Sequence, residues 1–352
     1  MTKQSNLNGN LMKAIVCTRY GSPEVLQLKE VEKPTPKDDE IRIKVRATSI
    51  TKADTMMRKG EPFFGRIFLG LMRPKKSIPG TGFAGTIDAV GKNVTQFKVG
   101  EKVFGETGVN FGANAEYVCM PAEGVLAPLP NNMTYEEAAP ICDGPLTAMN
   151  FLKAIADIQP GQKVLINGAS GSIGTAAVQI AKQYGAEVTG VCSSRNLELV
   201  KSIGADEVID YATTDFTTTG PTYDLIFDTV GKRSFSDCKK ALTPNGVYLS
   251  PVLTLKILFQ MLWTSRFGTK KAKFAATGLQ AIPDLRKLLS QVTNLIEAGH
   301  LKSIIDRRYS LELTAEAHRY VDTGRKKGNV VVLMNTDSTA KLQLGAEEQA
   351  TK

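Results

Sequence analysis

The chain has 352 residues, which allows two domains of ordinary size. Hydrophobic residues make up 42% and charged residues 22% of it, as in globular proteins, and no apolar run is long enough to span a bilayer. The net charge is +9, but lysines and arginines are spread along the chain without an arginine-rich arm. We therefore expect no specific nucleic-acid partner.

Histidine and cysteine are scarce, which limits metal and disulfide chemistry. The five cysteines are far apart and form no CxxC pair, and the only histidines are His300 and His318. This pattern predicts free thiols in a reducing compartment and no zinc site. Segment 1–10 is polar and lacks the apolar core of a signal peptide, so we expect a cytoplasmic protein.

The first part of the chain alternates short strands with turns. In segment 40–50, apolar and basic residues alternate from Ile41 to Arg46, the period of a strand with one buried face. A short helix is expected over 52–59, and a basic, aromatic loop follows over 61–77. Such a turn-rich region predicts a small β-barrel. Its other strands are expected over 11–20, 25–31, 80–91, 99–107 and 113–121.

From Thr134 onward, helices and strands alternate. Thr134 and Glu137 form the pattern of a capping box, which starts a helix that continues to about residue 157 with a break at Gly144-Pro145. The alternation predicts an α/β fold with a doubly wound parallel sheet. Strands are expected over 164–167, 187–192, 207–211, 224–230, 246–252, 273–277, 303–309 and 330–334, and the last two helices over 282–298 and 315–322.

The stretch around which this region is organised is a glycine-rich loop after the expected strand 164–167. Glycines follow at three-residue spacing, at 168, 171 and 174, and an amphipathic helix and a second strand come next. Small residues there permit a tight turn, close approach of a pyrophosphate and close packing of helix on strand. The helix amino terminus would direct N–H groups at phosphates. The pattern predicts a dinucleotide site at Ser170, Gly171, Ser172, Ile173 and Gly174.

The end of the second strand indicates which dinucleotide is bound. Sites that prefer NAD place a carboxylate there, whereas this chain has Ser193, Ser194 and Arg195, with no carboxylate expected to repel a 2′-phosphate. Lys201 and Tyr211 are expected to close the same pocket, so the sequence favours NADPH over NADH. The alternative is that Arg195 and Lys201 are ordinary solvated charges.

Two further segments have distinctive compositions. Segment 253–273 is very apolar and contains Trp263; a core or subunit interface is the favoured interpretation, and a weak contact with a membrane surface is the alternative, since Lys256, Arg266 and Lys270 lie in it. Segment 335–352 lacks apolar periodicity, and we expect it to be disordered.

Several local motifs follow one another in a characteristic order. They are PGTGFAG at 79–85 with Val90-Gly91, VGEKVFG at 99–105, AEY at 115–117, GPLTA at 144–148, LVKSIGAD at 199–206, IDR at 305–307 and AHR at 317–319. Together these motifs resemble the medium-chain dehydrogenase/reductase superfamily, and within it the zinc-free NADPH:quinone oxidoreductase-like branch. The resemblance covers about residues 12–334.

The resemblance implies a fold and a domain organisation. A GroES-like, β-rich catalytic domain is expected over 1–135 and 303–352, and a Rossmann cofactor domain over 136–302. It further implies a homodimer and places Thr147, Val230 and Arg325 among the candidate cofactor contacts.

The resemblance also implies a function. Zinc-dependent members carry Gly-His-Glu where this chain has Gly80-Thr81-Gly82, so the expected reaction is metal-independent transfer of hydride from NADPH to a quinone or an α,β-unsaturated carbonyl compound. The candidate catalytic residues are Thr51, Asp54 and Arg58, although relatives usually have Asn where Thr51 stands and Tyr where Met56 stands. The alternative is a non-enzymatic NADPH-binding protein, such as a redox sensor or an RNA- or membrane-associated factor.

Overall fold

A computed structural model describes residues 10–218 and 220–334, so the tail 335–352 and its expected disorder lie outside the described residues. The chain forms two compact units, one built from the residues up to Cys142 and again from Ile305, the other from Asp143 to Ile304. The boundaries expected from the sequence, 135/136 and 302/303, differ from these by a few residues. No helix among the described residues is both long and apolar enough to cross a membrane.

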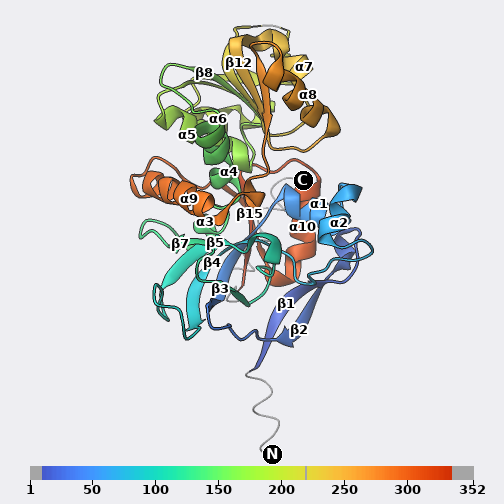
Figure 1. Ribbon diagram of the computed structural model, residues 1–352, viewed down its shortest axis with the longest axis vertical. Coiled ribbons are helices and arrows are strands. Elements are labelled where there is room, and N and C mark those ends of the chain that lie inside the picture. Colours follow the sequence, from blue (N-terminus) through green and yellow to red (C-terminus); the bar gives the residue numbers. More distant parts are fainter. Residues whose placement is uncertain (1–9, 219, 335–352) are drawn as a thin grey trace, which may run out of the picture. The chain divides into compact units, whose positions relative to one another are not determined.

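The first unit contains a seven-stranded sheet (Figure 1). Its order is β14-β15-β3-β4-β5-β7, and β6 also pairs with β3. The central strand β3 alternates buried and partly exposed residues over most of its length, as its sequence pattern predicts. The strands are β3 (Glu40–Ile50), β4 (Gly82–Val90), β5 (Lys102–Glu106), β6 (Tyr117–Pro121), β7 (Val125–Pro128), β14 (Ile305–Ser310) and β15 (Asn329–Leu333).

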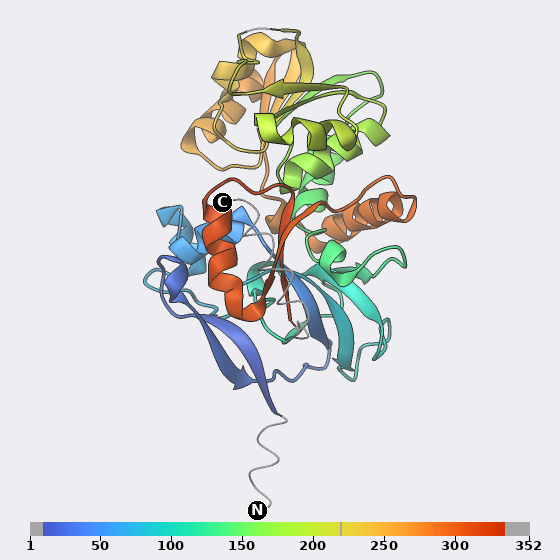
Figure 2. The same cartoon turned by 180° about the vertical axis from the view of Figure 1, so that it is seen from behind.

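A two-stranded hairpin and four α-helices complete this unit. The hairpin joins β1 (Leu11–Cys17) to β2 (Leu26–Glu32). Helix α10 packs against β15, β14 and β2 (Figure 2). The helices are α1 (Lys52–Lys59), α2 (Arg66–Leu69), α3 (Tyr135–Ala138) and α10 (Thr314–Asp322).

The second unit is a parallel six-stranded sheet with the order β10-β9-β8-β11-β12-β13. This is the 3-2-1-4-5-6 order of dinucleotide-binding folds, which confirms the predicted doubly wound sheet. The strands are β8 (Lys163–Asn167), β9 (Glu187–Cys192), β10 (Glu207–Asp210), β11 (Tyr223–Asp228), β12 (Leu242–Ser250) and β13 (Lys271–Phe274).

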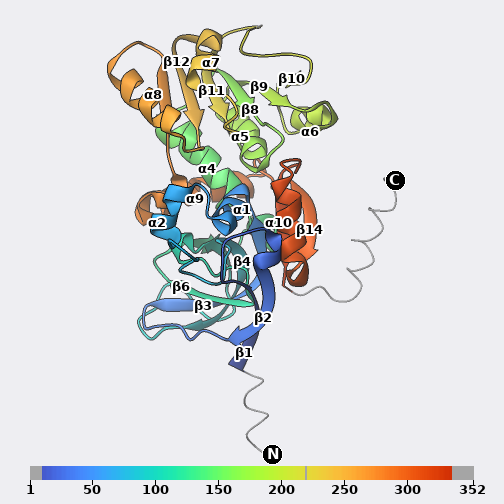
Figure 3. The same ribbon diagram turned by 90° about the vertical axis from the view of Figure 1, so that its right-hand side faces the viewer.

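Helices cover both faces of this parallel sheet. In Figure 3, α5 and α6 lie on one side of the strands and α8 on the other. A core that includes Leu165, Ile226 and Tyr248 fills the space beneath the helices. The helices are α4 (Gly144–Met149), α5 (Ser172–Gln183), α6 (Leu197–Ser202), α7 (Phe235–Cys238), α8 (Leu255–Arg266) and α9 (Ile282–Glu297).

Candidate nucleotide site and substrate pocket

The loop between β8 and α5 has the backbone geometry that its glycines predict. Gly168 has φ of +81°, a conformation that residues with a Cβ atom rarely adopt. A Cβ atom at Gly174 would lie 2.1 Å from the Gly168 carbonyl oxygen, so only glycine allows α5 to approach β8 this closely. The chain therefore turns sharply after β8, and the first residues of α5 pack directly on the end of that strand.

The amino terminus of α5 offers donors to an anion. Its cap residue is Gly171, which has no side chain to accept the first N–H groups of this 12-residue helix. A Cβ atom at Gly171 would meet only the Gly168 carbonyl oxygen, at 3.4 Å, so the space beside this backbone is open. Open space, backbone N–H groups at the start of a helix and the positive end of a helix dipole fit a pyrophosphate. The predicted residues 170–174 all lie in this turn.

Asn196, which the sequence analysis did not single out, supports the loop. Its Nδ2 donates to Ser170 Oγ at 3.0 Å, and its side chain is buried. Its Oδ1 is also buried and has no partner among the described residues. Asn196 therefore fixes the position of the Ser170 hydroxyl group beside the phosphate-binding turn.

The end of β11 closes the other side of the loop. Buried Asp228 accepts hydrogen bonds from Asn167 Nδ2 at 2.8 Å and from the Val230 and Gly231 N–H groups at 3.1 Å each. Val230 is thereby held beside Gly168, and its side chain is 44% exposed. Asn167 and Asp228 end neighbouring parallel strands, a signal that could have marked them in the sequence.

Thr147 lies on α4, which packs directly on α5. The packing is close at Gly144, where a Cβ atom would lie 2.5 Å from Ser172 Oγ. Thr147 is half-buried, one turn along α4 from this contact. The structure thus brings Thr147 and Val230 to the same loop as residues 170–174.

The structure brings together only some of the residues predicted to bind the 2′-phosphate. The Tyr211 N–H group donates to the Cys192 carbonyl at 3.1 Å, so the ends of β10 and β9 are adjacent. Ser194, Arg195 and Tyr211 are exposed there, and Ser193 is half-buried. These four residues can reach one ligand group at the carboxyl edge of the sheet.

Two of the expectations about this pocket need correction. A carboxylate is present, because Ser194 Oγ donates to Asp210 Oδ2 at the end of β10. This hydrogen bond and one from the Ala212 N–H group lower the pKa of Asp210, so it is ionised at neutral pH. Lys201 lies elsewhere: α6 runs antiparallel to the strands, and Lys201 in its last turn donates to the Asp206 carbonyl before β10 begins. It therefore lies at the opposite edge of the sheet.

In the first unit, Thr51 and Asp54 cap helix α1. Thr51 Oγ1 accepts from the Asp54 N–H group at 3.1 Å, and Asp54 Oδ2 accepts from the Thr51 N–H group at 2.8 Å and its hydroxyl at 2.6 Å. Burial raises the pKa of Asp54, against the opposing effect of these hydrogen bonds. Both residues have a structural role that explains their presence without a catalytic one.

Arg58 lies in a buried charged cluster between α1 and α10. Its Nη2 is 2.6 Å from Asp322 Oδ2, while Nε and Nη1 are buried without a partner among the described residues. Partial burial opposes ionisation of Asp322, but hydrogen bonds from Lys59 and Arg58 outweigh it and lower its pKa to about 2. Burial, reinforced by the charge of Arg58, lowers the pKa of His318 to about 3, so the ring is neutral.

Asp54 and Arg58 also line a pocket of about 120 Å³ within the first unit. Its walls are mostly apolar, and Lys75 and Lys76 from the 61–77 loop contribute the other charges. A cavity of about 150 Å³ holds one benzene molecule. The pocket therefore has room for about one ring. The remaining lining residues include Cys17, Tyr20, Met57, Leu69, Val109 and Phe111.

Glu106 is a buried acid that the sequence analysis missed. It ends β5, where it pairs with Gly82 of β4, and it is 9% exposed. Among the described residues no hydrogen bond or ion pair reaches its carboxyl group, and burial raises its pKa to about 7. The other buried acids, Asp54 and Asp228, accept hydrogen bonds. The signal in the sequence was a carboxyl residue directly after the buried run Val103–Gly105.

The remaining predicted residue, Arg325, belongs to the first unit, in the turn between α10 and β15. It is exposed, and its role as a cofactor contact stays a prediction. Nowhere in the described part of the chain do three or more His, Cys, Asp or Glu side chains gather as metal ligands. The residues present do not fit a zinc site.

Comparison with known proteins identifies the family. Residues 37–131 match the alcohol dehydrogenase GroES-like domain and residues 203–332 match the zinc-binding dehydrogenase family, whose description mentions a metal that the residues of this chain do not fit. The chain is 32% identical to the chloroplast envelope quinone oxidoreductase homolog of Arabidopsis thaliana, covering 92% of this chain and 99% of the relative.

Two further likenesses agree with this match. The 2-methylene-furan-3-one reductase of Solanum lycopersicum is 30% identical, covering 91% of this chain and 79% of that protein. The quinone oxidoreductase structure from Coxiella burnetii superposes with a TM-score of 0.82 at 27% identity, covering 92% of this chain and all of the other. Members of this family are oxidoreductases that use a nicotinamide nucleotide, for which the glycine loop is suited. The chain belongs to the medium-chain dehydrogenase/reductase superfamily, in its quinone oxidoreductase-like branch.

Proposed function

We propose that the protein is an NADPH-dependent reductase of small quinones or α,β-unsaturated carbonyl compounds. The observation that carries this proposal is the open, glycine-capped amino terminus of α5 in a sheet of the 3-2-1-4-5-6 order. The names of two relatives, a quinone oxidoreductase homolog and a 2-methylene-furan-3-one reductase, support the substrate class. The pocket of about 120 Å³ favours substrates with a single ring or a short chain.

The residues of the second unit hold and orient the dinucleotide in this proposal. The first N–H groups of α5 bind the pyrophosphate, and Asn196 keeps the Ser170 hydroxyl group in place beside it. Ser193, Arg195 and Tyr211 bind the adenosine ribose and its 2′-phosphate. Thr147 and Val230 line the path toward the nicotinamide, which supplies the hydride when it is bound.

For the proton that completes reduction of an enone, we propose Glu106 as the donor. Glu106 ends β5 and pairs with Gly82, in the segment where zinc-dependent relatives carry Gly-His-Glu and two residues from Gly80 of the pocket wall. Glu106 does not itself line the pocket, so in this proposal its proton reaches the substrate through a water molecule. Thr51 and Asp54 hydrogen-bond to each other, and Arg58 is paired with Asp322, so in this proposal Asp54 and Arg58 shape the pocket and Thr51 caps α1. A carboxyl group that stays protonated near neutral pH can donate. Glu106→Gln should lower enone turnover at least about tenfold with unchanged NADPH affinity; unchanged turnover would remove Glu106 from the mechanism.

The test of the function is an oxidation assay. Purified protein is mixed with NADPH and a panel that includes benzoquinone, phenanthrenequinone and short enones, and absorbance of the reduced nicotinamide is followed. We expect oxidation with the single-ring quinone and the short enones, and slower oxidation with the three-ring quinone. Tight NADPH binding without oxidation across the panel would favour the alternative, a non-enzymatic NADPH-binding protein.

A matched variant separates loss of binding from loss of fold. Gly171 has ordinary extended angles, φ of −82° and ψ of 179°, so Asp fits there. Gly171→Asp would cap α5, yet its carboxylate would repel a pyrophosphate. We expect an equally or more stable protein that no longer binds nucleotide. Retained binding would contradict the proposed phosphate site.

The choice of NADPH over NADH has its own test, because Asp210 lies beside Ser194. Arg195→Glu should weaken NADPH binding by about 10- to 100-fold and leave NADH nearly unchanged, since only NADPH carries the 2′-phosphate. Asp210→Asn should strengthen NADPH binding by removing a repulsive charge. If Asp210 instead binds the ribose hydroxyl of NADH, the same variant would weaken NADH, and isothermal calorimetry distinguishes these outcomes.

We also propose a cytoplasmic homodimer. The five cysteines are free thiols, which suits a reducing compartment. Strand β13 ends the parallel sheet and leaves one edge for pairing with a second copy. Sedimentation velocity at several concentrations would measure the oligomeric state, and a purely monomeric protein would contradict the dimer.

A further inference from the structure

Helix α8 exposes a large apolar face. The exposed fractions are 81% for Leu255, 66% for Phe259, 67% for Leu262 and 56% for Trp263. Phe267, directly after the helix, is 55% exposed. The opposite face packs inward, where Ile257, Gln260 and Thr264 are buried. Contiguous apolar patches of this kind are uncommon on monomeric proteins and mark interaction sites.

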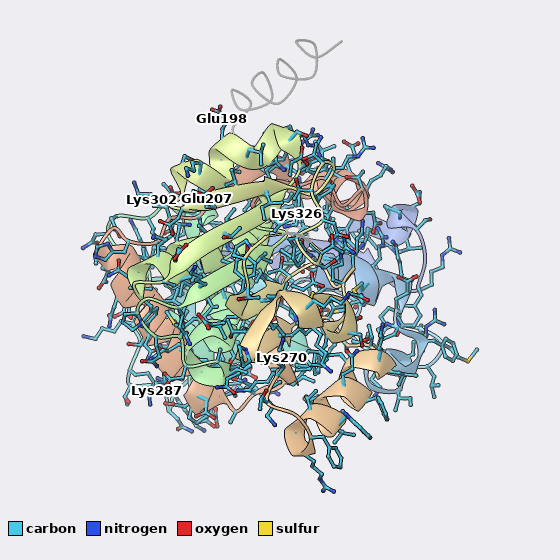
Figure 4. All side chains as sticks on the ribbon, turned by 90° about the horizontal axis from the view of Figure 1, so that it is seen from above. Glu198, Glu207, Lys270, Lys287, Lys302 and Lys326 are labelled. Carbon is cyan, nitrogen blue, oxygen red and sulfur yellow. The ribbon has the colours of Figure 1, made fainter. Side chains whose placement is uncertain are left out.

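The exposed residues form one continuous strip, because they recur at intervals of three and four along the helix. The aromatic rings are packed along it: the Phe259 and Trp263 centroids are 6.3 Å apart, and those of Trp263 and Phe267 are 4.8 Å apart. Figure 4 shows side chains of α8 pointing away from the rest of the second unit. We call these five residues, Leu255, Phe259, Leu262, Trp263 and Phe267, the α8 strip.

The charge around the α8 strip is mostly positive. The exception is Asp237, whose pKa is lowered by hydrogen bonds from Ser234 and further by the charge of Lys256. Lys256 and Arg266 are exposed on the same helix. Residues 238–283 include seven Lys and Arg and no Asp or Glu. Lys270 and Lys271 donate to backbone carbonyl groups of their own unit, and no ion pair with a carboxylate is found for either of them in the described part of the chain.

The exposed apolar side chains and the positive charge around them distinguish between the possible binding partners of the α8 strip. A two-fold contact with a second copy through α8 would bring the lysines and arginines of both copies together with few acidic partners to offset them, at a cost in free energy. An anionic membrane surface complements both properties, since aromatic and leucine side chains enter the interface while lysine and arginine attract the lipid headgroups. We propose that the α8 strip docks this protein onto anionic lipid membranes.

The proposal is independent of the catalytic function, and the fluorescence of a residue in the strip can test it. Trp263, within the strip, is the single tryptophan of the chain. Insertion into the lipid interface should shift its fluorescence to shorter wavelength and expose it to quenching by brominated lipids. Vesicles of phosphatidylcholine with phosphatidylserine should produce both effects, and vesicles of phosphatidylcholine alone should produce weaker ones.

Three variants test the two contributions separately. Phe259→Ser with Leu262→Ser should weaken vesicle binding about tenfold or more while keeping the Trp263 reporter. Lys256→Glu with Arg266→Glu should weaken it by a similar factor, and added salt should reproduce this loss. The control Leu279→Ser removes a 75% exposed leucine outside the strip and should leave binding unchanged.

Fold and oligomeric state are followed for every variant by circular dichroism and sedimentation velocity. Absence of any wavelength shift with phosphatidylserine vesicles would overturn the proposal. It would also be overturned if the apolar variant turned a dimer into a monomer and the wild-type fluorescence changed with protein concentration instead of with lipid. That result would identify a second copy of the chain as the occupant.

Discussion

At the scale of single residues, a side chain can match a family's catalytic motif and yet have a structural role. Asp54 stands where the family's acid is expected, but it accepts from the Thr51 hydroxyl group and N–H group and so caps α1. Arg58 is retained as well, and Asp322 pairs with it. The capping box was readable from the Thr51 and Asp54 spacing, whereas the partner of Arg58 was not, since Asp322 is 264 residues away.

Glu106 allows a prediction about the pH dependence of stability. Its pKa is about 7 in the folded protein, against an ordinary 4.5, so folding favours the protonated form. The free energy of unfolding should therefore fall as pH rises from about 4.5 to about 7, by about 3 kcal/mol from this group, and then level off. Glu106→Gln should remove that fall and be the more stable protein at pH 8.

Urea denaturation of the two proteins at a series of pH values measures this difference. Glu101→Gln, an exposed change in the turn before the same strand, is the control and should follow the wild type. If the free energies of unfolding of Glu106→Gln and of the wild type change in parallel with pH, the carboxyl group of Glu106 is not the unpartnered buried acid described above.

At the scale of elements, the sequence predicted best where periodicity is strong. The β-α-β unit around the glycine loop is confirmed, with strands at Lys163–Asn167 and Glu187–Cys192. The four-residue strand β7 was missed because it is short and ends in proline. The helix expected to run to about residue 157 with a break at Gly144-Pro145 is indeed interrupted, between Ala138 and Gly144, but its last part is a π-helical turn, Asn150–Ile155. Local patterns do not reveal such a turn, since tertiary packing overrides propensity there.

In the candidate nucleotide site, too, some residues were predictable from local sequence and others were not. The phosphate turn follows from local spacing, so residues 170–174 were predictable. Asp210 was not weighed, because it approaches Ser194 through the parallel pairing of β10 with β9. Lys201 was misplaced because its end of α6 was not assigned to an edge of the sheet. Contacts that depend on which strands pair, and in which direction, could not be predicted from the local sequence pattern.

The link between α1 and α10 gives a prediction at this scale. Asp322 contacts Arg58, whose side chain is 1% exposed, and Lys59. Asp322→Asn would leave the Arg58 charge buried without its partner, so we expect the first unit to lose about 3 kcal/mol of stability. Asp38→Asn, which breaks an exposed pair with Lys92, is the matched control and should cost less than about 1 kcal/mol. Equal losses in urea denaturation would contradict the importance of the cluster.

At the scale of the whole molecule, the two units differ in how the chain builds them. The second unit is one continuous segment, from Asp143 to Ile304. The first unit needs both ends of the described chain, because β15 pairs with β3 and β14 pairs with β15. Without the residues after 304, β3 would lose the neighbour along Ala47–Ile50, and Arg58 would lose Asp322.

This topology predicts different behaviour of two fragments. The fragment 143–304 should fold alone with a cooperative urea transition, and nucleotide at about 100 times its Kd should raise the free energy of unfolding by about 2.7 kcal/mol. The fragment 1–142 should not fold cooperatively, because it exposes an unpaired edge of β3 and buries an uncompensated arginine. Adding a 305–334 segment through a short linker should restore its folding. Cooperative unfolding of 1–142 by itself, or a 143–304 fragment that stays unfolded with nucleotide present, would contradict this division of the chain.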